Sequence, residues 1–140
     1  MDFSRLRLHR RKNNQYLVAP KGHTADAPHR IAPVFDRPVE ALAGDFRRHA
    51  LAQPRVRLLD VSTDGRKLEL VQRSRLFRFP DRISVEFLPL DDGLSTLAIF
   101  SRAKYGSNDF GVNRKRIDSW LAAIGAPAVE FQPADSPASA

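Results

Sequence analysis

The chain has 140 residues, 42% of them hydrophobic, no cysteine and a formal net charge of +7. This length and composition predict one compact domain, and the lack of cysteine excludes disulfides, a thiol nucleophile and a thiolate metal site. No apolar run suits a transmembrane helix and no signal peptide is visible, so a cytoplasmic location is the default expectation. The positive charge favours an anionic membrane surface or an acidic ligand as partner, ahead of nucleic acid.

Residues 1–16 form a basic arm ahead of a domain expected to span residues 17–125. Leu6 and Leu8 alternate with arginines, a pattern compatible with a short edge strand. Basic termini can bind phosphate, but they are more often solvated and mobile, and this is the favoured interpretation. Nucleic-acid binding through the arm is an alternative.

A short extended segment at residues 15–20 leads into a predicted surface loop at 21–33. The loop contains His23, Asp26 and His29, which have side chains that can bind a metal ion. No helix or strand would fix these three side chains, and no fourth ligand is visible. We therefore predict no metal site and no cofactor.

A first helix is predicted over residues 36–52. Pro38 suits the first turn, where its missing N–H is not needed, and Pro54 ends the pattern. Five apolar residues share one helical face and are expected to contact the core: Val39, Leu42, Ala43, Phe46 and Ala50.

Four strands are predicted next, joined by short links. Thr63-Asp64-Gly65 and Asp91-Asp92-Gly93 are tight-turn signals. Short links favour antiparallel neighbours, so the prediction is an α+β domain in the order α-β-β-β-β-α, with a four-stranded antiparallel meander and two helices packed on one face. The predicted strands cover residues 56–61, 67–74, 82–88 and 94–102.

The link between the second and third strands alternates arginine with large apolar residues. Such a mixture suits an anionic membrane face, with rings at the boundary and guanidinium groups on phosphate, and it also suits stacking on bases. The favoured interpretation is a hairpin whose phenylalanines turn inward to cap the core. The candidate surface-binding residues are Arg75, Phe77, Arg78, Phe79 and Arg82.

The last helix is predicted to begin near Phe110, after a turn that contains the good N-cap residues Ser107, Asn108 and Asp109. A projection at about 100° per residue places Asn113 in the middle of the apolar face. That face is formed by Ile117, Trp120, Leu121 and Ile124. Beyond the helix, residues 126–140 are rich in Ala, Pro and Ser and are predicted to be a disordered tail.

A buried amide needs hydrogen-bond partners, because leaving it unpaired costs roughly 1–3 kcal/mol. Candidates for Asn113 are Ser101 and Arg102 at the strand end and Asp109 in the turn. The favoured interpretation is a structural clamp between the last strand and the last helix, and the alternative is a ligand pocket there. Asp81 is expected to pair with Arg102 or Arg114. The predicted polar cluster comprises Arg73, Asp81, Arg102, Tyr105, Asp109, Asn113, Arg114 and Arg116.

Signals for an enzyme are weak, and no catalytic residue is assigned. The sequence has no Gly-x-Ser-x-Gly elbow, no phosphate-cradling loop and no zinc-protease histidine pair. If the junction is a pocket, Arg102 and Arg114 are the residues expected to hold a carboxylate or phosphate.

Residues 101–116, Ser-Arg-Ala-Lys-Tyr-Gly-Ser-Asn-Asp-Phe-Gly-Val-Asn-Arg-Lys-Arg, resemble the C-terminal signature of an uncharacterised family, domain of unknown function 1499. Phe110 stands where the family usually has Leu. Upstream, Arg73-Ser74 and Phe79-Pro80-Asp81 resemble its middle motif, and residues 32–35 resemble its start.

This resemblance implies no established reaction, ligand or catalytic residue. Many relatives carry a signal, a lipoprotein anchor or a membrane helix ahead of the domain, so an envelope location is the alternative to the cytoplasm. We expect a non-enzymatic binding or scaffolding domain that acts near an anionic membrane surface. The alternatives are a small-ligand pocket at the strand–helix junction and nucleic-acid binding through the arm.

Overall fold

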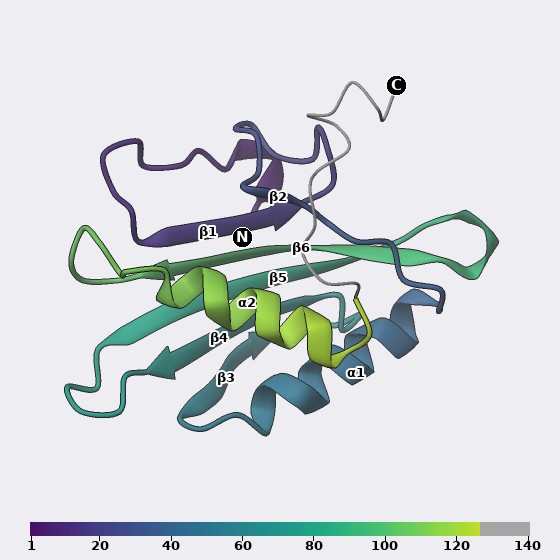
Figure 1. Cartoon of the computed structure of the whole chain (residues 1–140). Coiled ribbons are helices and arrows are strands. Elements are labelled where there is room, and N and C mark those ends of the chain that lie inside the picture. Colours follow the sequence, from purple (N-terminus) through teal and green to yellow (C-terminus); the bar gives the residue numbers. More distant parts are fainter. Residues whose placement is uncertain (127–140) are drawn as a thin grey trace.

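The computed structural model describes residues 1–126, in which six strands form one sheet and two helices cover one of its faces (Figure 1). Across the sheet the strand order is β2-β1-β6-β5-β4-β3. The strands are β1 (Gln15–Ala19), β2 (Arg30–Ile31), β3 (Val56–Val61), β4 (Lys67–Arg73), β5 (Pro80–Pro89) and β6 (Ser95–Ala103), and the helices are α1 (Val39–Leu51) and α2 (Val112–Ala123). The tail predicted at 126–140 lies outside the described residues, apart from Ala126.

The α+β class is confirmed, but the sheet has six strands instead of four. β3 to β6 are antiparallel neighbours in chain order, as their short links predict. β1 adds to the free side of β6 in the antiparallel direction, and β2 adds to β1 in the parallel direction, so the sheet is mixed. Both extra strands are short, and β1 pairs with a strand from the far end of the chain, so no turn signal marks either pairing.

The main core lies between the sheet and the two helices. Phe46 of α1 is almost fully buried, and its ring meets Phe87 of β5 and Trp120 of α2 edge-on at centroid distances of 5.5 and 5.9 Å. The apolar faces predicted for both helices are the faces that point into this core. Burial of these aromatic and aliphatic side chains is the main stabilising contribution to the fold.

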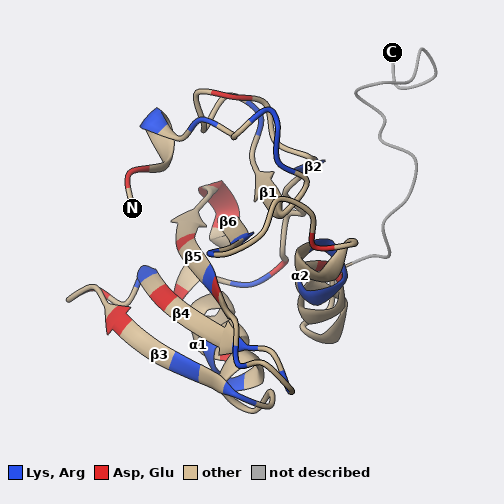
Figure 2. Ribbon diagram, turned by 90° about the vertical axis from the view of Figure 1, so that its left-hand side faces the viewer, with Lys and Arg blue, Asp and Glu red and all other residues tan. Residues whose placement is uncertain are grey.

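The first residues of the chain pack on the opposite face of the sheet (Figure 2). A short 3-10 helix, η1 (Phe3–Arg5), buries the Phe3 ring against Leu17 of β1 and Phe100 of β6. Leu6 and Leu8 contact the same cluster, and no strand forms there, so the predicted edge strand is wrong. Apolar residues thus hold this segment against the sheet, in contrast to the solvated arm expected from its charge.

Neither helix described in residues 1–126 has the length and hydropathy needed to cross a bilayer.

The segment at residues 1–8 contacts chiefly β1 and β6. On this second face, which is called the open face below, Arg57, Leu59 and Val61 of β3 are exposed and the side chain of Arg82 on β5 is 42% exposed.

Candidate functional site

Asp109 fixes the start of α2. Its Oδ1 accepts a hydrogen bond from the Gly111 amide and its Oδ2 accepts one from the Asn113 amide, both at 2.9 Å. Gly111 stands at the N-cap with φ of 82°, in the left-handed region that favours glycine. Asp109 is therefore the residue that satisfies amide groups of the first turn.

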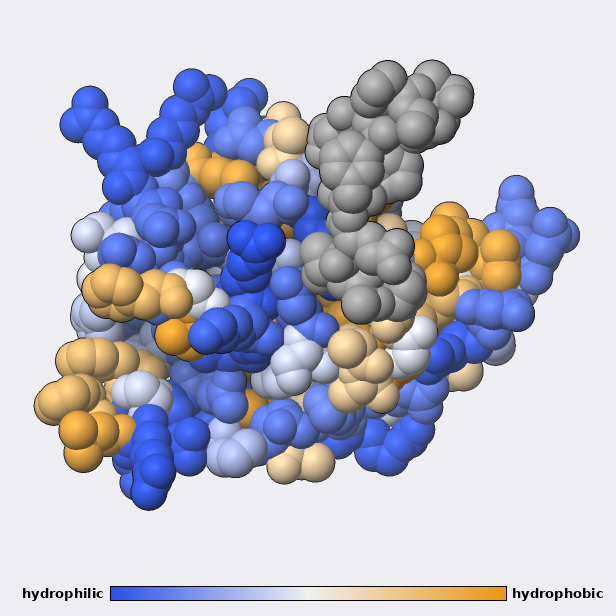
Figure 3. Space-filling model, viewed as in Figure 1, coloured by the Kyte–Doolittle hydropathy of each residue, from blue (hydrophilic) through white to orange (hydrophobic). Residues whose placement is uncertain are grey.

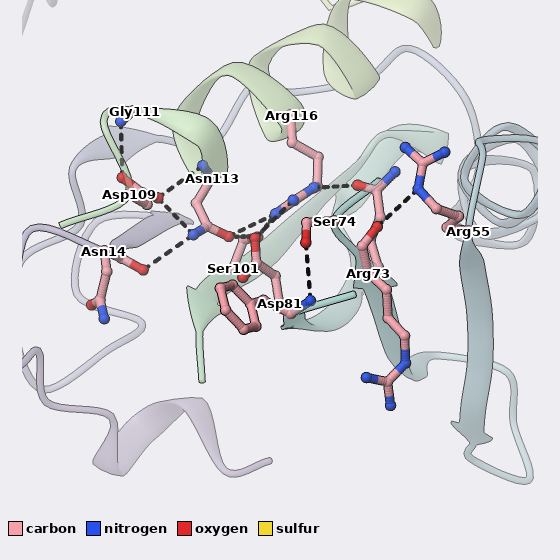
Figure 4. Close-up of polar contacts among 12 residues, drawn as sticks. Asn14, Arg55, Arg73, Ser74, Asp81, Ser101, Asp109, Gly111, Asn113 and Arg116 are labelled. Carbon is pink, nitrogen blue, oxygen red and sulfur yellow. Dashed lines mark hydrogen bonds and ion pairs between the residues drawn. The ribbon is translucent and has the colours of Figure 1, made fainter. Parts of the chain in front are cut away.

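Asn113 is fully buried at the junction of β1, β6 and α2 (Figure 4). Its Oδ1 accepts hydrogen bonds from Ser101 Oγ at 2.5 Å and Arg116 Nη1 at 2.7 Å. Its Nδ2 donates to the Asn14 carbonyl at 3.1 Å and to Asp109 Oδ2 at 2.7 Å. The side-chain amide thus uses its hydrogen-bonding capacity fully, and the predicted partners Ser101 and Asp109 are present. This arrangement is called the Asn113 clamp.

Arg116 extends the Asn113 clamp across two more strands. Its Nη2 lies 2.8 Å from Asp81 Oδ2 on β5, its Nη1 also contacts Ser101, and its Nε donates to Gln72 Oε1 on β4. The prediction that Asp81 pairs with Arg102 or Arg114 is therefore wrong. Burial raises the pKa of Asp81 above its ordinary value; Arg116 opposes this shift, and the nearby Asp109 adds to it.

Arg102 and Arg114 lie on different sides of the molecule. Because side chains alternate along a strand, Ser101 points to the helices and Arg102 points to the open face, where it donates to Ser84 Oγ at 2.7 Å and stacks on Phe100. Arg114 is exposed on α2, 3.9 Å from Asp118. The expectation that Arg102 and Arg114 together hold one anion is wrong.

A cleft of about 350 Å³ lies beside the Asn113 clamp, between the ends of β4 and β5 and the start of α2. Arg55 Nε donates to the Arg73 carbonyl at 3.0 Å, and Arg73 Nη1 donates to the Arg78 carbonyl at the same distance. Tyr105 is 58% exposed at the edge of this cleft. The other lining residues include Gln72, Ser74, Phe79, Asp81, Asp109, Val112 and Arg116.

The link between β4 and β5, residues 74–79, is called the aromatic loop. Its large side chains point to solvent: Leu76 is 78% exposed, Phe77 69% and Phe79 55%. The two phenylalanine rings stack at 5.6 Å, and Tyr105 meets Phe79 edge-on at 6.1 Å. The favoured interpretation that these rings cap the core is wrong, because side chains of both helices and of the sheet's inner face already fill it.

Cations surround the aromatic loop without acidic partners. Figure 2 looks onto this end of the sheet and shows lysines and arginines in the loop and in the chain ahead of β1. Within residues 1–126, no carboxylate lies within ion-pair distance of the cations in or next to the loop. These cations are Arg55, Arg73, Arg75, Arg78 and Lys104.

A second polar cluster, which local patterns did not predict, lies where α2 meets β1 and β2. Asp118 accepts a hydrogen bond from the Tyr16 hydroxyl at 2.8 Å and pairs with the buried Arg30 at 3.0 Å. The His29 ring stacks on Tyr16, and its Nδ1 accepts a bond from the Leu17 amide. Burial and the bond to Asp118 raise the pKa of Tyr16. These residues meet only through the pairing of β1 and β2, which local patterns did not predict.

The three candidate metal ligands of the 21–33 loop make separate contacts. His23 pairs with Glu86 at 2.9 Å, Asp26 accepts a bond from the Leu8 amide, and His29 lies beside Tyr16. Across residues 1–126, no three histidine or acidic side chains are grouped closely enough to hold a metal ion.

A family model described as "Protein of unknown function (DUF1499)" matches residues 6–124, which is most of the chain. No curated protein matches the sequence.

Proposed function

The chain belongs to the DUF1499 family of proteins of unknown function, and we propose that it is a non-enzymatic domain that docks on an anionic membrane surface through the aromatic loop. The observation that carries this proposal is the exposed pair of stacked rings, Phe77 and Phe79, among cations that have no acidic partner. This loop also contains Arg75 and Arg78 and is bordered by Tyr105 and Lys104.

The apolar side chains supply the first contribution to docking. Leu76, Phe77 and Phe79 project from one loop, and Phe110, 86% exposed, projects from the neighbouring loop between β6 and α2. Figure 3 shows hydrophobic residues at the end of the molecule that carries both loops. Full burial of one such side chain contributes about 1.5–3 kcal/mol, so two or three that reach the acyl boundary support reversible binding.

The cations supply the second contribution. Each Lys or Arg held near an anionic leaflet contributes about 1 kcal/mol, and this attraction decays within a Debye length. Arg75 and Arg78 lie in the loop with the rings, so their guanidinium groups would meet lipid phosphates while the rings enter the boundary. Because no acidic side chain neutralises them, their charge is available to a partner.

We propose a structural role for the Asn113 clamp. Its polar groups satisfy one another, which supports a clamp in preference to a ligand pocket. Through Arg116 and Asp81 the clamp ties α2 to the strand that leaves the aromatic loop. A rigid base of this kind reduces the conformational entropy lost when the loop binds.

Co-sedimentation with vesicles tests the proposal. The chain should sediment with vesicles of phosphatidylcholine mixed with an anionic phospholipid, and it should stay in the supernatant with phosphatidylcholine alone. Raised salt should weaken the binding, because it screens the cations. Equal sedimentation with both kinds of vesicle, or no sedimentation with either kind, would refute docking on an anionic surface.

A further inference from the structure

Two arginines stand directly opposite each other on the open face of the sheet. Arg82 of β5 is in register with Arg102 of β6 on one side and with Val71 of β4 on the other. Both arginine side chains point to the open face, because side chains alternate along a strand and the adjacent residues, Ile83 on β5 and Ser101 on β6, point to the helices. Like charges in opposite cross-strand positions are destabilising.

Among residues 1–126 a single carboxylate is paired with these two arginines. Glu69 lies 3.0 Å from Arg82 Nη2, and it also accepts a bond from Ser84 Oγ and lies 3.8 Å from the Met1 amine. Arg102 has no carboxylate within ion-pair distance among the residues that the structure describes. The buried Nε of Arg82 has no hydrogen-bond partner in the described part of the chain. The pair therefore has donors and positive charge that the protein itself does not satisfy.

Burial supports the same conclusion for Arg102. Burial lowers the pKa of this guanidinium; Glu69 opposes the shift, and the nearby Arg82 adds to it. A partly buried cation beside another cation is stabilised when an anion binds next to it.

A groove of about 410 Å³ opens over the two arginines. Its apolar lining comes from Leu59, Val71 and Pro80, and two further cations, Arg73 and Lys104, stand along it. The groove therefore has four cations and no acidic residue in its lining. Arg73 ends β4 and Pro80 begins β5, so the groove reaches the strand ends that hold the aromatic loop. It is called the basic groove.

We propose that the basic groove binds the phosphate group of an anionic phospholipid headgroup. The proposal rests on membrane docking by the aromatic loop and names the lipid chemistry that the docked domain recognises. Arg82 and Arg102 hold the phosphate, since guanidinium groups donate paired hydrogen bonds to its oxygens. Arg73 and Lys104 add charge at the strand ends, and the apolar lining contacts the glycerol and the first acyl carbons.

Soluble phosphates test the groove without a membrane. Inorganic phosphate and glycerol phosphate should each raise the Tm of the full chain above its value in chloride at equal ionic strength, because a ligand that binds only the folded state stabilises it. The same Tm in phosphate and in chloride would overturn the proposal.

Substitution of the two arginines tests the location. Arg82→Gln with Arg102→Gln should abolish the phosphate-dependent rise in Tm and weaken binding to vesicles that contain phosphatidic acid by about tenfold or more. Arg57→Gln is the matched control, because Arg57 lies across from Val71 but outside the groove lining. If the double variant does not fold, Arg73→Gln with Lys104→Gln, both exposed, gives the same comparison. An unchanged phosphate effect in these variants would refute the location.

Serine substitutions in the aromatic loop separate the two proposals. Phe77→Ser with Phe79→Ser should weaken vesicle binding and leave the phosphate-dependent rise in Tm unchanged. If phosphate raises the Tm of the unmodified chain but the chain binds no vesicles, then neither membrane docking nor lipid binding by the groove is correct. The basic groove would then be a site for a soluble phosphate ester. Vesicle binding without any phosphate effect would refute the basic groove and leave membrane docking standing.

Discussion

At the scale of single residues, Asn113 is the position where the sequence was most informative. An amide in the middle of an apolar helical face predicts burial and hydrogen-bond partners, and the structure has both. The predicted cluster contained both Arg102 and Arg116, and the sequence could not show that only Arg116 contacts Asn113. Both are arginines close to the junction, and the pleat of β6 alone directs Arg102 to the open face.

Replacing Asn113 should destabilise the fold strongly. Asn113→Ala leaves buried groups of Ser101, Arg116 and Asn14 without a partner, so the free energy of unfolding should fall by about 3 kcal/mol in urea titrations. Lys115→Ala, on the exposed side of the same helix, is the control and should change it by less than about 0.5 kcal/mol. A small effect for Asn113→Ala would show that the Asn113 clamp does not support the fold.

The carboxyl group of Asp81 should give a distinctive pH dependence. Burial raises its pKa in the folded state above the ordinary value, so its protonated form contributes stability at low pH that is lost as the pH rises through the folded-state pKa. The free energy of unfolding of the unmodified chain, relative to Asp81→Asn, should therefore increase as the pH falls through that pKa. Urea titrations of both chains over a pH series measure this difference. If this difference in the free energy of unfolding shrinks as the pH falls, the Arg116 ion pair has a larger effect on the pKa of Asp81 than desolvation has.

At the scale of elements, the two basic segments of the chain differ in what their apolar residues do. Phe3 is buried at 3% exposure and holds residues 1–8 to the sheet, whereas Phe77 is 69% exposed in the aromatic loop. From the sequence we expected the reverse, a mobile arm and inward-facing phenylalanines. Local composition could not decide this, because the apolar strip that receives Phe3 is built from β1 and β6 and exists only after these distant strands pair.

Phe3 and Phe77 therefore form a matched pair for a stability test. Phe3→Ala should lower the free energy of unfolding by about 3–5 kcal/mol, as expected for a buried ring, and Phe77→Ala should change it by less than about 0.5 kcal/mol. Denaturant titration of both variants provides the comparison. Similar losses for the two would contradict the assignment of Phe3 to the second core and of Phe77 to solvent.

Loop residues should also control membrane affinity without affecting the fold. Phe77→Ser with Phe79→Ser removes two exposed rings, and the vesicle partition coefficient should fall by about tenfold or more, because each buried ring contributes about 1.5–3 kcal/mol. Val34→Ser, at an apolar residue that is 58% exposed outside the loop, should leave the coefficient unchanged. Equal effects of the two changes would contradict docking through this loop.

At the scale of the whole molecule, the main structural features lie on different parts of the sheet. One face carries the helices and the core, the other carries the first residues of the chain and the basic groove, and one end carries the aromatic loop (Figures 1 and 2). The meander and both helices were predictable because periodicity and turns are local signals. The two added strands, the second core and the arginine pair depend on pairing between distant segments, which one sequence does not reveal.

The absence of cysteine gives the most direct test of membrane docking, since an introduced thiol is unique. Phe77→Cys, labelled with an environment-sensitive fluorophore, should shift its emission to the blue on anionic vesicles and be quenched by brominated acyl chains, because the probe enters the lipid boundary. The control is Val34→Cys, beside the bridge between Phe35 and Ser95 at the other end of β6, which carries the same fluorophore and should show neither change. A probe at position 77 that stays in water while the chain is bound to anionic vesicles would contradict docking through the aromatic loop.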